Sequence, residues 1–175
     1  TLADVLINQG ISGGEGYGTQ SVIHPTHGAN WGDANSNVGV GISVGTNQIQ
    51  VSEHSSNFIS SPLVYNAPIQ GWRHVLLIYD SKVPKLFMDG VLVKTGLQST
   101  RQFVRPSSGY DNIYPESGFG RSFTPNGSPK GQFFGSFDDI AIWNRVLSTQ
   151  EISALSNRYS ITWSTGATTN TITVN

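Results

Sequence analysis

The carboxylates are the residues of this sequence best suited to chemistry, and Asp138 and Asp139 are the only two that stand side by side. On an extended strand, adjacent side chains point to opposite faces. One of the two could therefore join backbone carbonyl and amide oxygens around a Ca²⁺ ion, which takes about six to eight oxygen ligands. The alternative is a carboxylate that accepts N–H bonds from a loop without a metal. The residues leave both interpretations open.

Retaining hydrolysis of a glycosidic bond needs two carboxylates about 5.5 Å apart across the scissile bond. Alternate positions on one strand provide that spacing. None of the four glutamates stands two positions from another carboxylate; they are Glu15, Glu53, Glu116 and Glu151. Catalysis of this type lacks its residues within this chain, so we expect no enzyme activity.

Sugar recognition combines aromatic rings, which cover the apolar face of a sugar, with polar groups that bind its hydroxyls. Trp31 has this setting, because Asn30 and Asp33 lie beside it in a polar stretch. The alternative is that Trp31 folds back onto the edge of the core. Two tyrosines also lie in loop-like sequence. The expected ligand-binding residues are Trp31, Asn30, Asp33, Tyr110 and Tyr114.

Three other polar features are best interpreted as parts of the structure without a functional role. Residues 33–37 carry Asp and Asn on alternate positions, but the Gly and Glu of an EF-hand loop are missing, which favours an ordinary polar loop. His24 and His27 flank Pro25, which prevents a helix that would align the two imidazoles, so we expect solvated loop histidines and no zinc site. His74, in an apolar stretch, is expected to be a sheet histidine.

Charged residues form only 12% of the sequence, about half of the roughly 25% found in an average soluble domain. The ten basic residues are scattered between Arg73 and Arg158, and the formal net charge is −1. A nucleic-acid-binding protein needs a basic stripe facing the phosphates, so that class is excluded. Because the sequence has no Cys, disulfides, thiolate chemistry and cysteine-based zinc sites are also excluded.

The composition predicts an exported protein. Gly, Ser, Thr and Asn take the place of charged residues, as is typical of secreted β-proteins, and no apolar run approaches the about 20 residues of a membrane helix. The chain opens on Thr1 and shows no signal peptide. We expect a fragment of a larger secreted or cell-surface protein, without membrane insertion, whose targeting sequence lies outside it.

Short alternating apolar stretches separated by Gly, Asn, Ser and Pro indicate an all-β fold. Residues 38–44 and 48–53 should form a hairpin around the turn 45–47. In the second of these strands, Ile49 and Val51 should face away from the polar residues between them.

Residues 72–79 are apolar on both faces, which predicts a central strand covered on both sides. The clearest local signal follows it. Residues 85–88 and 91–94 flank Asp89-Gly90, a dipeptide that tolerates the positive φ angles of a two-residue type I′ hairpin turn. The expected pairs join Met88 to Val91, Phe87 to Leu92 and Leu86 to Val93.

Residues 133–143 should form a long strand. After it, Ser148 and Glu151 make a capping box, in which a hydroxyl and a carboxylate bind the free amides at a helix start. A short helix at about 149–156 should dock through Ile152 and Leu155. The aromatic residues expected in the core are Trp72, Phe87, Phe137 and Trp143.

Two segments carry a resemblance to a known family. Residues 71–93 contain W-R-H-V, then Y-D, then L-F-M-D-G, and residues 134–155 read F-G-S-F-D-D-I-A-I-W-N-R-V-L-S followed by E-I and L. Both runs resemble those of bacterial laminin-G-like domains of the concanavalin A-like lectin/glucanase family. Their order and spacing make the resemblance strong, and it extends loosely over residues 38–157.

The resemblance implies an all-β, two-sheet antiparallel jelly-roll sandwich over residues 1–158, with one short helix near 149–156. It also implies a structural calcium ion near Asp138 and Asp139. The family includes glycanases whose catalytic strand carries Glu-x-Asp-x-x-Glu, a motif that this chain lacks. The strands that usually open the family pattern are not recognisable here.

Residues 159–175 are expected to be a tail or the start of a following β-module, because their W-S-T-G-A-T-T run resembles adhesin repeats of the Bacteroidetes type. The expected function is a non-catalytic extracellular module that binds carbohydrate or mediates adhesion within a larger protein. Its partner would be a glycan or an extracellular protein. The alternatives are a structural spacer in an adhesin and an accessory domain of a glycoside hydrolase whose catalytic domain lies elsewhere.

Overall fold

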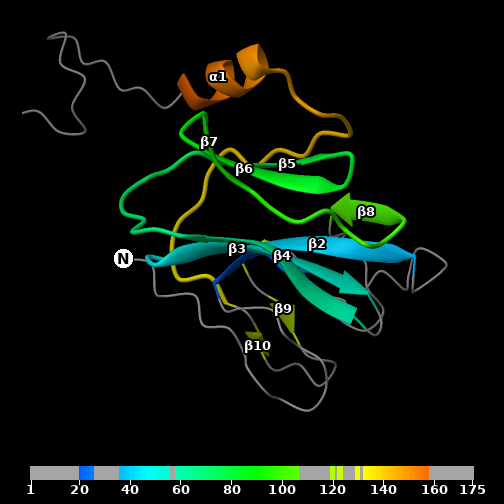
Figure 1. The fold of residues 1–175 in the computed structure, drawn as a ribbon. Coiled ribbons are helices and arrows are strands. Elements are labelled where there is room, and N and C mark those ends of the chain that lie inside the picture. Colours follow the sequence, from blue (N-terminus) through cyan, green and yellow to red (C-terminus); the bar gives the residue numbers. More distant parts are fainter. Residues whose placement is uncertain are drawn as a thin grey trace, which may run out of the picture.

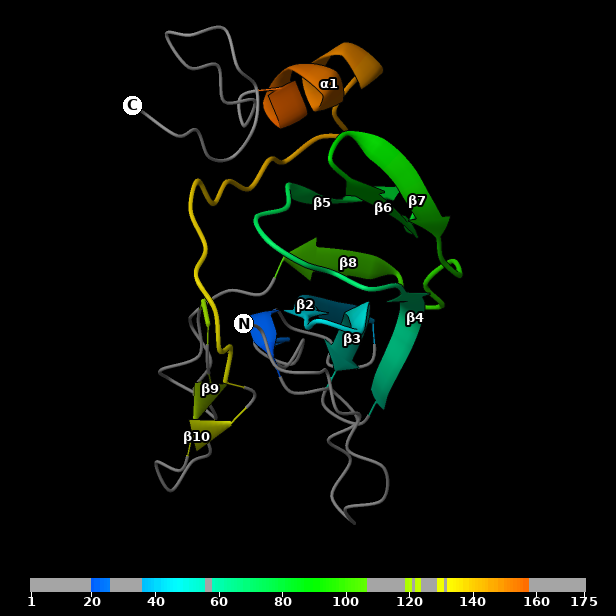
Figure 2. The ribbon, with the colours of Figure 1, turned by 90° about the vertical axis from the view of Figure 1, so that its left-hand side faces the viewer.

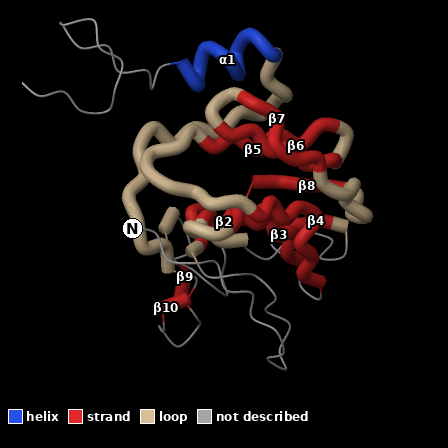
Figure 3. Tube along the Cα trace, turned by 60° about the vertical axis from the view of Figure 1, so that its left-hand side comes forward, coloured by secondary structure: helices blue, strands red, loops and turns tan. Residues whose placement is uncertain are grey.

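The computed structural model describes residues 20–25, 36–55, 58–106, 119–120, 122–123, 129–130 and 132–157. Within them, two sheets form successive layers, and a short helix lies on the far side of the smaller sheet (Figures 1 and 3). This arrangement confirms the predicted two-sheet sandwich with one short helix. Two further strands of two residues each, β9 (Ser122–Phe123) and β10 (Pro129–Lys130), pair with each other.

The larger sheet has the order β1–β2–β3–β4, and all of these neighbours are antiparallel. A fifth strand, β8, pairs in parallel with the first half of β2. The predicted β2–β3 hairpin is confirmed, and the Gly45 N–H closes it by donating to the Gln48 carbonyl. The strands are β1 (Ser21–Ile23), β2 (Asn37–Val44), β3 (Gln48–Ser55), β4 (Phe58–Asn66) and β8 (Phe103–Pro106).

The smaller sheet has the order β5 (Val75–Asp80), β6 (Val83–Met88) and β7 (Val91–Thr95). Asp89 and Gly90 have φ angles of 51° and 80°, which confirms a hairpin turn with two residues at positive φ. The pairs Met88–Val91 and Phe87–Leu92 are also confirmed. The third predicted pair is wrong: Leu86 lies opposite Lys94, because the register shifts between Leu86 and Phe87.

The main core fills the space between the two sheets. Alternate residues of β2 and β3 enter it, as the sequence pattern predicts, and Leu86 of β6 meets them from the smaller sheet. The buried side chains of this cluster are Val40, Ile42, Val44, Ile49, Val51, Leu63, Ile69 and Leu86. Burial of apolar area on this scale is the main stabilising contribution to such a sandwich.

Helix α1 (Thr149–Asn157) confirms the predicted helix and its capping box. The Ser148 hydroxyl accepts the Glu151 N–H at 3.3 Å, and the Ser148 N–H donates to the Glu151 carboxylate at 2.8 Å. Arg145 also binds this carboxylate, and the two partners together hold the pKa of Glu151 down at about 2. Ile152 packs on the outer face of β5.

The predicted strand over residues 133–143 is wrong. These residues form an extended segment that pairs with none of the described strands, and Figure 2 shows it as the yellow-to-orange trace along one side of the molecule. An apolar alternating sequence becomes a strand only where a neighbouring strand receives its backbone hydrogen bonds. Phe137 and Trp143, expected in the core, are exposed here.

The prediction for residues 72–79 is correct in part. Strand β5 begins at Val75, and both of its faces are covered, one by the main core and the other by α1 and Leu147. However, β5 pairs only with β6 among the described strands, so it lies at an edge of its sheet. Trp72 precedes the strand and is exposed, which contradicts its expected place in the core; Phe87 is half-buried against α1.

Candidate functional site

The residues expected to bind a ligand lie outside the described part of the chain. This holds for Asn30, Trp31, Asp33, Tyr110 and Tyr114, and their role stays a prediction. His27 and the tail, residues 159–175, also lie outside it.

Asp138 and Asp139 lie on the exposed extended segment before α1. The Asp139 N–H donates to the Asp138 carboxylate at 2.9 Å, and Asp139 has a φ of 50°. The described residues hold no group of three or more His, Cys, Asp or Glu side chains that could bind a metal ion. A calcium ion here would therefore need further oxygen ligands from backbone groups or from the rest of the chain.

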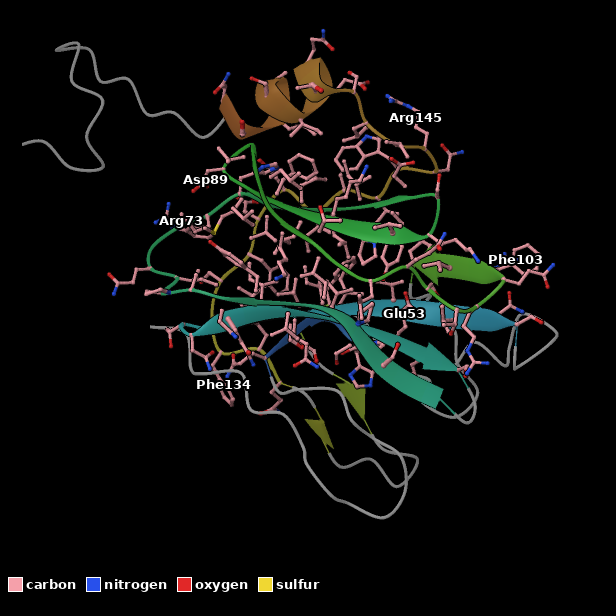
Figure 4. The ribbon with its side chains drawn as sticks, in the orientation of Figure 1. Glu53, Arg73, Asp89, Phe103, Phe134 and Arg145 are labelled. Carbon is pink, nitrogen blue, oxygen red and sulfur yellow. The ribbon has the colours of Figure 1, made fainter. Side chains whose placement is uncertain are left out.

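A buried carboxylate between the two sheets is the most distinctive polar site that the structure describes. Glu53 follows Ile49 and Val51 in the alternation of β3, so its side chain enters the space between the sheets, where it is 1% exposed. The Tyr79 hydroxyl of β5 donates to one carboxylate oxygen at 3.0 Å. The Ser99 hydroxyl donates to the other at 2.7 Å. We call Glu53, Tyr79 and Ser99 the inter-sheet cluster; Figure 4 labels Glu53.

The segment that carries Ser99 is tied to the turn between β5 and β6. The Ser99 N–H donates to the Lys82 carbonyl at 2.9 Å, and the Lys82 ammonium donates to the Arg101 carbonyl at 3.0 Å. Ser81 and Lys82 have φ angles of 51° and 67°, so this turn, like the one at Asp89, uses positive φ. Glu53 thus joins a strand of the larger sheet to two segments on the other side of the core.

Burial raises the pKa of Glu53, because removal from water penalises the charged carboxylate. The hydrogen bonds from Ser99 and Tyr79, and the positive charges of Arg101 and Lys82, oppose this effect without cancelling it. Burial also raises the pKa of Tyr79, and the neighbouring carboxylate adds to that shift. Tyr79 therefore stays protonated and acts as a permanent hydrogen-bond donor.

The opposite face of β3 carries a second set of buried polar groups. The Gln50 amide donates to the Ser61 hydroxyl at 2.7 Å, and His54 Nδ1 lies 3.0 Å from the Pro25 carbonyl oxygen. Residues 23–25 cross so closely over Gly41 that a Cβ on this glycine would lie 2.3 Å from Pro25 Cδ. The expectation of a solvated His24 is wrong: pairing of β1 with β2 carries His24 onto the sheet, where it is buried.

Comparison with known families identifies the fold. Residues 14–153 match a laminin-G-type family model described as the concanavalin A-like lectin/glucanases superfamily. The chain belongs to the concanavalin A-like lectin/glucanase superfamily. The resemblance found in the two sequence runs is thereby confirmed, whereas the resemblance of the tail to adhesin repeats stays a prediction.

The other comparisons add little to this superfamily assignment. No curated protein matches the chain. A solved structure of residues 221–444 of an S-layer domain-containing protein from Clostridium thermocellum is similar at 16% identity and a TM-score of 0.32. The alignment covers 71% of this chain and 59% of that one. None of the helices in the described residues has the length and apolar character needed to cross a membrane.

Sequence reasoning missed the inter-sheet cluster, although one signal for it was present. The superfamily's sandwich requires one face of β3 to point inward, and Glu53 shares the parity of Ile49 and Val51. A carboxylate at such a position needs buried donors. The donors, Tyr79 and Ser99, are distant in sequence and have no local pattern that marks them as partners.

Proposed function

We propose that this chain is a non-catalytic binding module that recognises carbohydrate outside the cell. The superfamily to which it belongs takes its name from two classes, lectins, which bind sugars, and glucanases, which cleave them. Both classes need polar groups that recognise sugar hydroxyls. Only the cleaving class needs two carboxylates facing each other across a bound sugar.

The hydrogen bonds and the burial of Glu53 support assignment to the sugar-binding class rather than the cleaving class. Its two carboxylate oxygens accept hydrogen bonds from Tyr79 and Ser99, and the side chain is closed off between the sheets. No other carboxylate of the described residues bonds to this cluster. A buried carboxylate held in this way links the two layers, and a substrate cannot reach it without opening the core.

Other features of the proposal rest on the sequence. We place the chain in a larger secreted or cell-surface protein, with residues 1–158 as the binding domain and 159–175 as a tail or the start of a following module. Trp31 and its polar neighbours remain one expected sugar site. The competing functions are a spacer between adhesin repeats and an accessory domain of a glycoside hydrolase.

A glycan array probed with the whole chain tests the proposal, together with an assay for reducing ends released from β-glucans. We expect binding to at least one oligosaccharide and no release of reducing ends. Release that disappears in the variants Glu53→Gln or Glu116→Gln would contradict the non-catalytic assignment. A chain that binds no oligosaccharide would favour the spacer.

We also propose that calcium binds near Asp138 and Asp139. A ligand that binds only the folded state raises the melting temperature. We expect calcium to raise it and a chelator to lower it in the natural chain, but not in the double variant Asp138→Asn, Asp139→Asn. Identical melting curves for the natural chain with calcium and with chelator would remove the metal from the proposal.

A further inference from the structure

Trp72 exposes an unusually large part of its side chain. Its relative exposure is 71%, whereas tryptophan is on average among the more buried residues. It lies in the connection between β4 and β5, directly after Gly71, which has a φ of 67°. An indole in this position presents a flat apolar face and an N–H donor to solvent.

The two residues that follow Trp72 in the chain form hydrogen bonds that hold this connection against the β6–β7 turn. The Asp89 carboxylate accepts the His74 N–H at 3.0 Å, and the Asp89 N–H donates to the His74 carbonyl at 2.9 Å. Arg73 Nη1 also donates to the Asp89 carboxylate, at 2.7 Å. These bonds fix the backbone that carries the indole, so a ligand that stacks on it meets a preorganised surface.

A further bond holds the connection on the side that precedes Trp72. Arg73 Nε donates to the Gln70 carbonyl at 3.2 Å, which closes a small loop around Gly71. We call Gln70, Trp72, Arg73 and Asp89 the Trp72 corner. Figure 4 labels Arg73 and Asp89, which lie together at one side of the molecule below the helix.

The corner keeps polar groups within reach of solvent beside the indole. The Arg73 and Asp89 side chains are 41% and 44% exposed. A guanidinium has five N–H donors, and the bonds just described use two of them. The space next to Gly71 is open, because a Cβ added there would have no atom within 4 Å. A ring of ligand size can therefore approach the corner without meeting the protein backbone at this point.

We propose that the Trp72 corner is a binding site for neutral oligosaccharides, an inference that rests on the proposed carbohydrate-binding function. The indole covers the apolar face of a sugar ring, and Arg73 and Asp89 bind its hydroxyls as donor and acceptor. The two charges are opposite and already paired, so the corner offers no net attraction to sulfate or carboxylate groups. This pairing is the reason for choosing neutral glycans over acidic ones.

The test compares the natural chain with Trp72→Ala, Trp72→Phe and Leu97→Ala by titration calorimetry. The probes are the neutral hexasaccharides of cellulose, xylan, laminarin and chitin, and a heparin hexasaccharide as the acidic arm. Leu97 is the matched control, because it is an apolar side chain that is 75% exposed elsewhere on the surface. Trp72→Ala should weaken binding of a neutral probe by about tenfold or more, and Leu97→Ala by less than about twofold.

Trp72→Phe keeps an aromatic face and should fall between the natural chain and Trp72→Ala. All three variants should melt like the natural chain, since the replaced side chains are exposed. If a neutral probe binds the natural chain and Trp72→Ala equally well, the Trp72 corner is not the binding site. The proposed carbohydrate-binding function would be unaffected by this result. Binding of heparin alone would overturn the neutral assignment. If no probe binds the natural chain, the proposed function fails together with the corner.

One more outcome would assign Trp72 to a protein interface. Light scattering of the natural chain and of Trp72→Ala gives their oligomeric states. Suppose that the natural chain forms a dimer, that Trp72→Ala is a monomer, and that no neutral probe competes with dimerisation. The indole would then mediate contact between two copies of the chain, and the proposed glycan site would be overturned. We expect equal molar masses for the two proteins.

Discussion

The inter-sheet cluster and the Trp72 corner are built on the same principle, but they lie in opposite environments. In each, one carboxylate joins segments that are far apart in the sequence: Glu53 binds Tyr79 and Ser99, and Asp89 binds Arg73 and the His74 backbone. Glu53 is 1% exposed, whereas the Asp89 side chain is 44% exposed. The difference indicates that burial, rather than residue type, separates a structural carboxylate from one that can meet a ligand.

The energetic consequences follow from this difference. A buried carboxylate that loses a donor keeps the full cost of its removal from water, whereas an exposed ion pair that loses a partner is solvated at once. We therefore expect substitutions in the inter-sheet cluster to change stability. Substitutions in the Trp72 corner should instead change binding, as long as the turn at Asp89 and Gly90 remains intact.

The largest effect should come from that turn. Gly90 has a φ of 80°, and a Cβ there would lie 2.5 Å from the Ser156 hydroxyl of α1. We expect Gly90→Val to lower the free energy of unfolding by roughly 2 kcal/mol or more, from backbone strain together with the clash. Urea denaturation measures the loss.

Gly71→Val is the matched control, because Gly71 also has positive φ, at 67°, but has open space around it. This variant carries the strain without the clash and should lose roughly 1 kcal/mol less than Gly90→Val. If Gly90→Val stays within a few tenths of a kcal/mol of the natural chain, the turn is assigned wrongly.

The next effect concerns the buried hydrogen bond of Tyr79. Tyr79→Phe removes the hydroxyl that donates to Glu53 and should cost about 1–3 kcal/mol, because the carboxylate oxygen stays buried without this donor. Tyr65→Phe is the control, since Tyr65 packs against the same core and has no carboxylate partner among the described residues. Equal losses in the two variants would show that the Glu53 bond adds nothing to stability.

The pH dependence of stability should report on the buried carboxylate of Glu53. Burial raises the folded-state pKa of Glu53 above its ordinary 4.5, so the folded protein holds this proton more tightly than the unfolded chain. The stability that Glu53 contributes is therefore complete below about pH 4.5 and is lost as the pH rises through the folded-state pKa.

Glu53→Gln should remove this dependence, because the amide cannot ionise. Melting temperatures of the natural chain and the variant, compared from pH 4.5 to pH 8, should diverge toward higher pH in favour of the variant. Parallel curves would mean that the carboxylate titrates in the folded protein as it does in water.

The smallest effect on stability should come from the exposed ion pair. Arg73→Ala should lower the free energy of unfolding by about 0.2–1 kcal/mol, with a smaller loss in high salt. Chemical denaturation at low and high ionic strength checks this. A loss as large as that of Tyr79→Phe would make the Trp72 corner a structural element and weaken its interpretation as a binding site.

The accuracy of the sequence predictions depended on how local the signal was. The turn at Asp89-Gly90 and the Ser148–Glu151 cap were predicted correctly, because each needs only a few adjacent residues to satisfy its own backbone. The strand at 133–143 was predicted from alternation alone, but the described structure gives it no pairing partner. Trp72 was assigned to the core from its hydrophobicity, although the strand begins only at Val75.

The sequence by itself determined the all-β class, the two hairpins, the capped helix and the superfamily, because alternation, turn residues and helix caps are written in neighbouring positions. Only the tertiary structure decided that Glu53 is a buried link and that Trp72 is exposed. Both depend on which distant segments lie against them. Burial is a property of the assembled layers, so the same residue type can stabilise the core in one place and face a ligand in another.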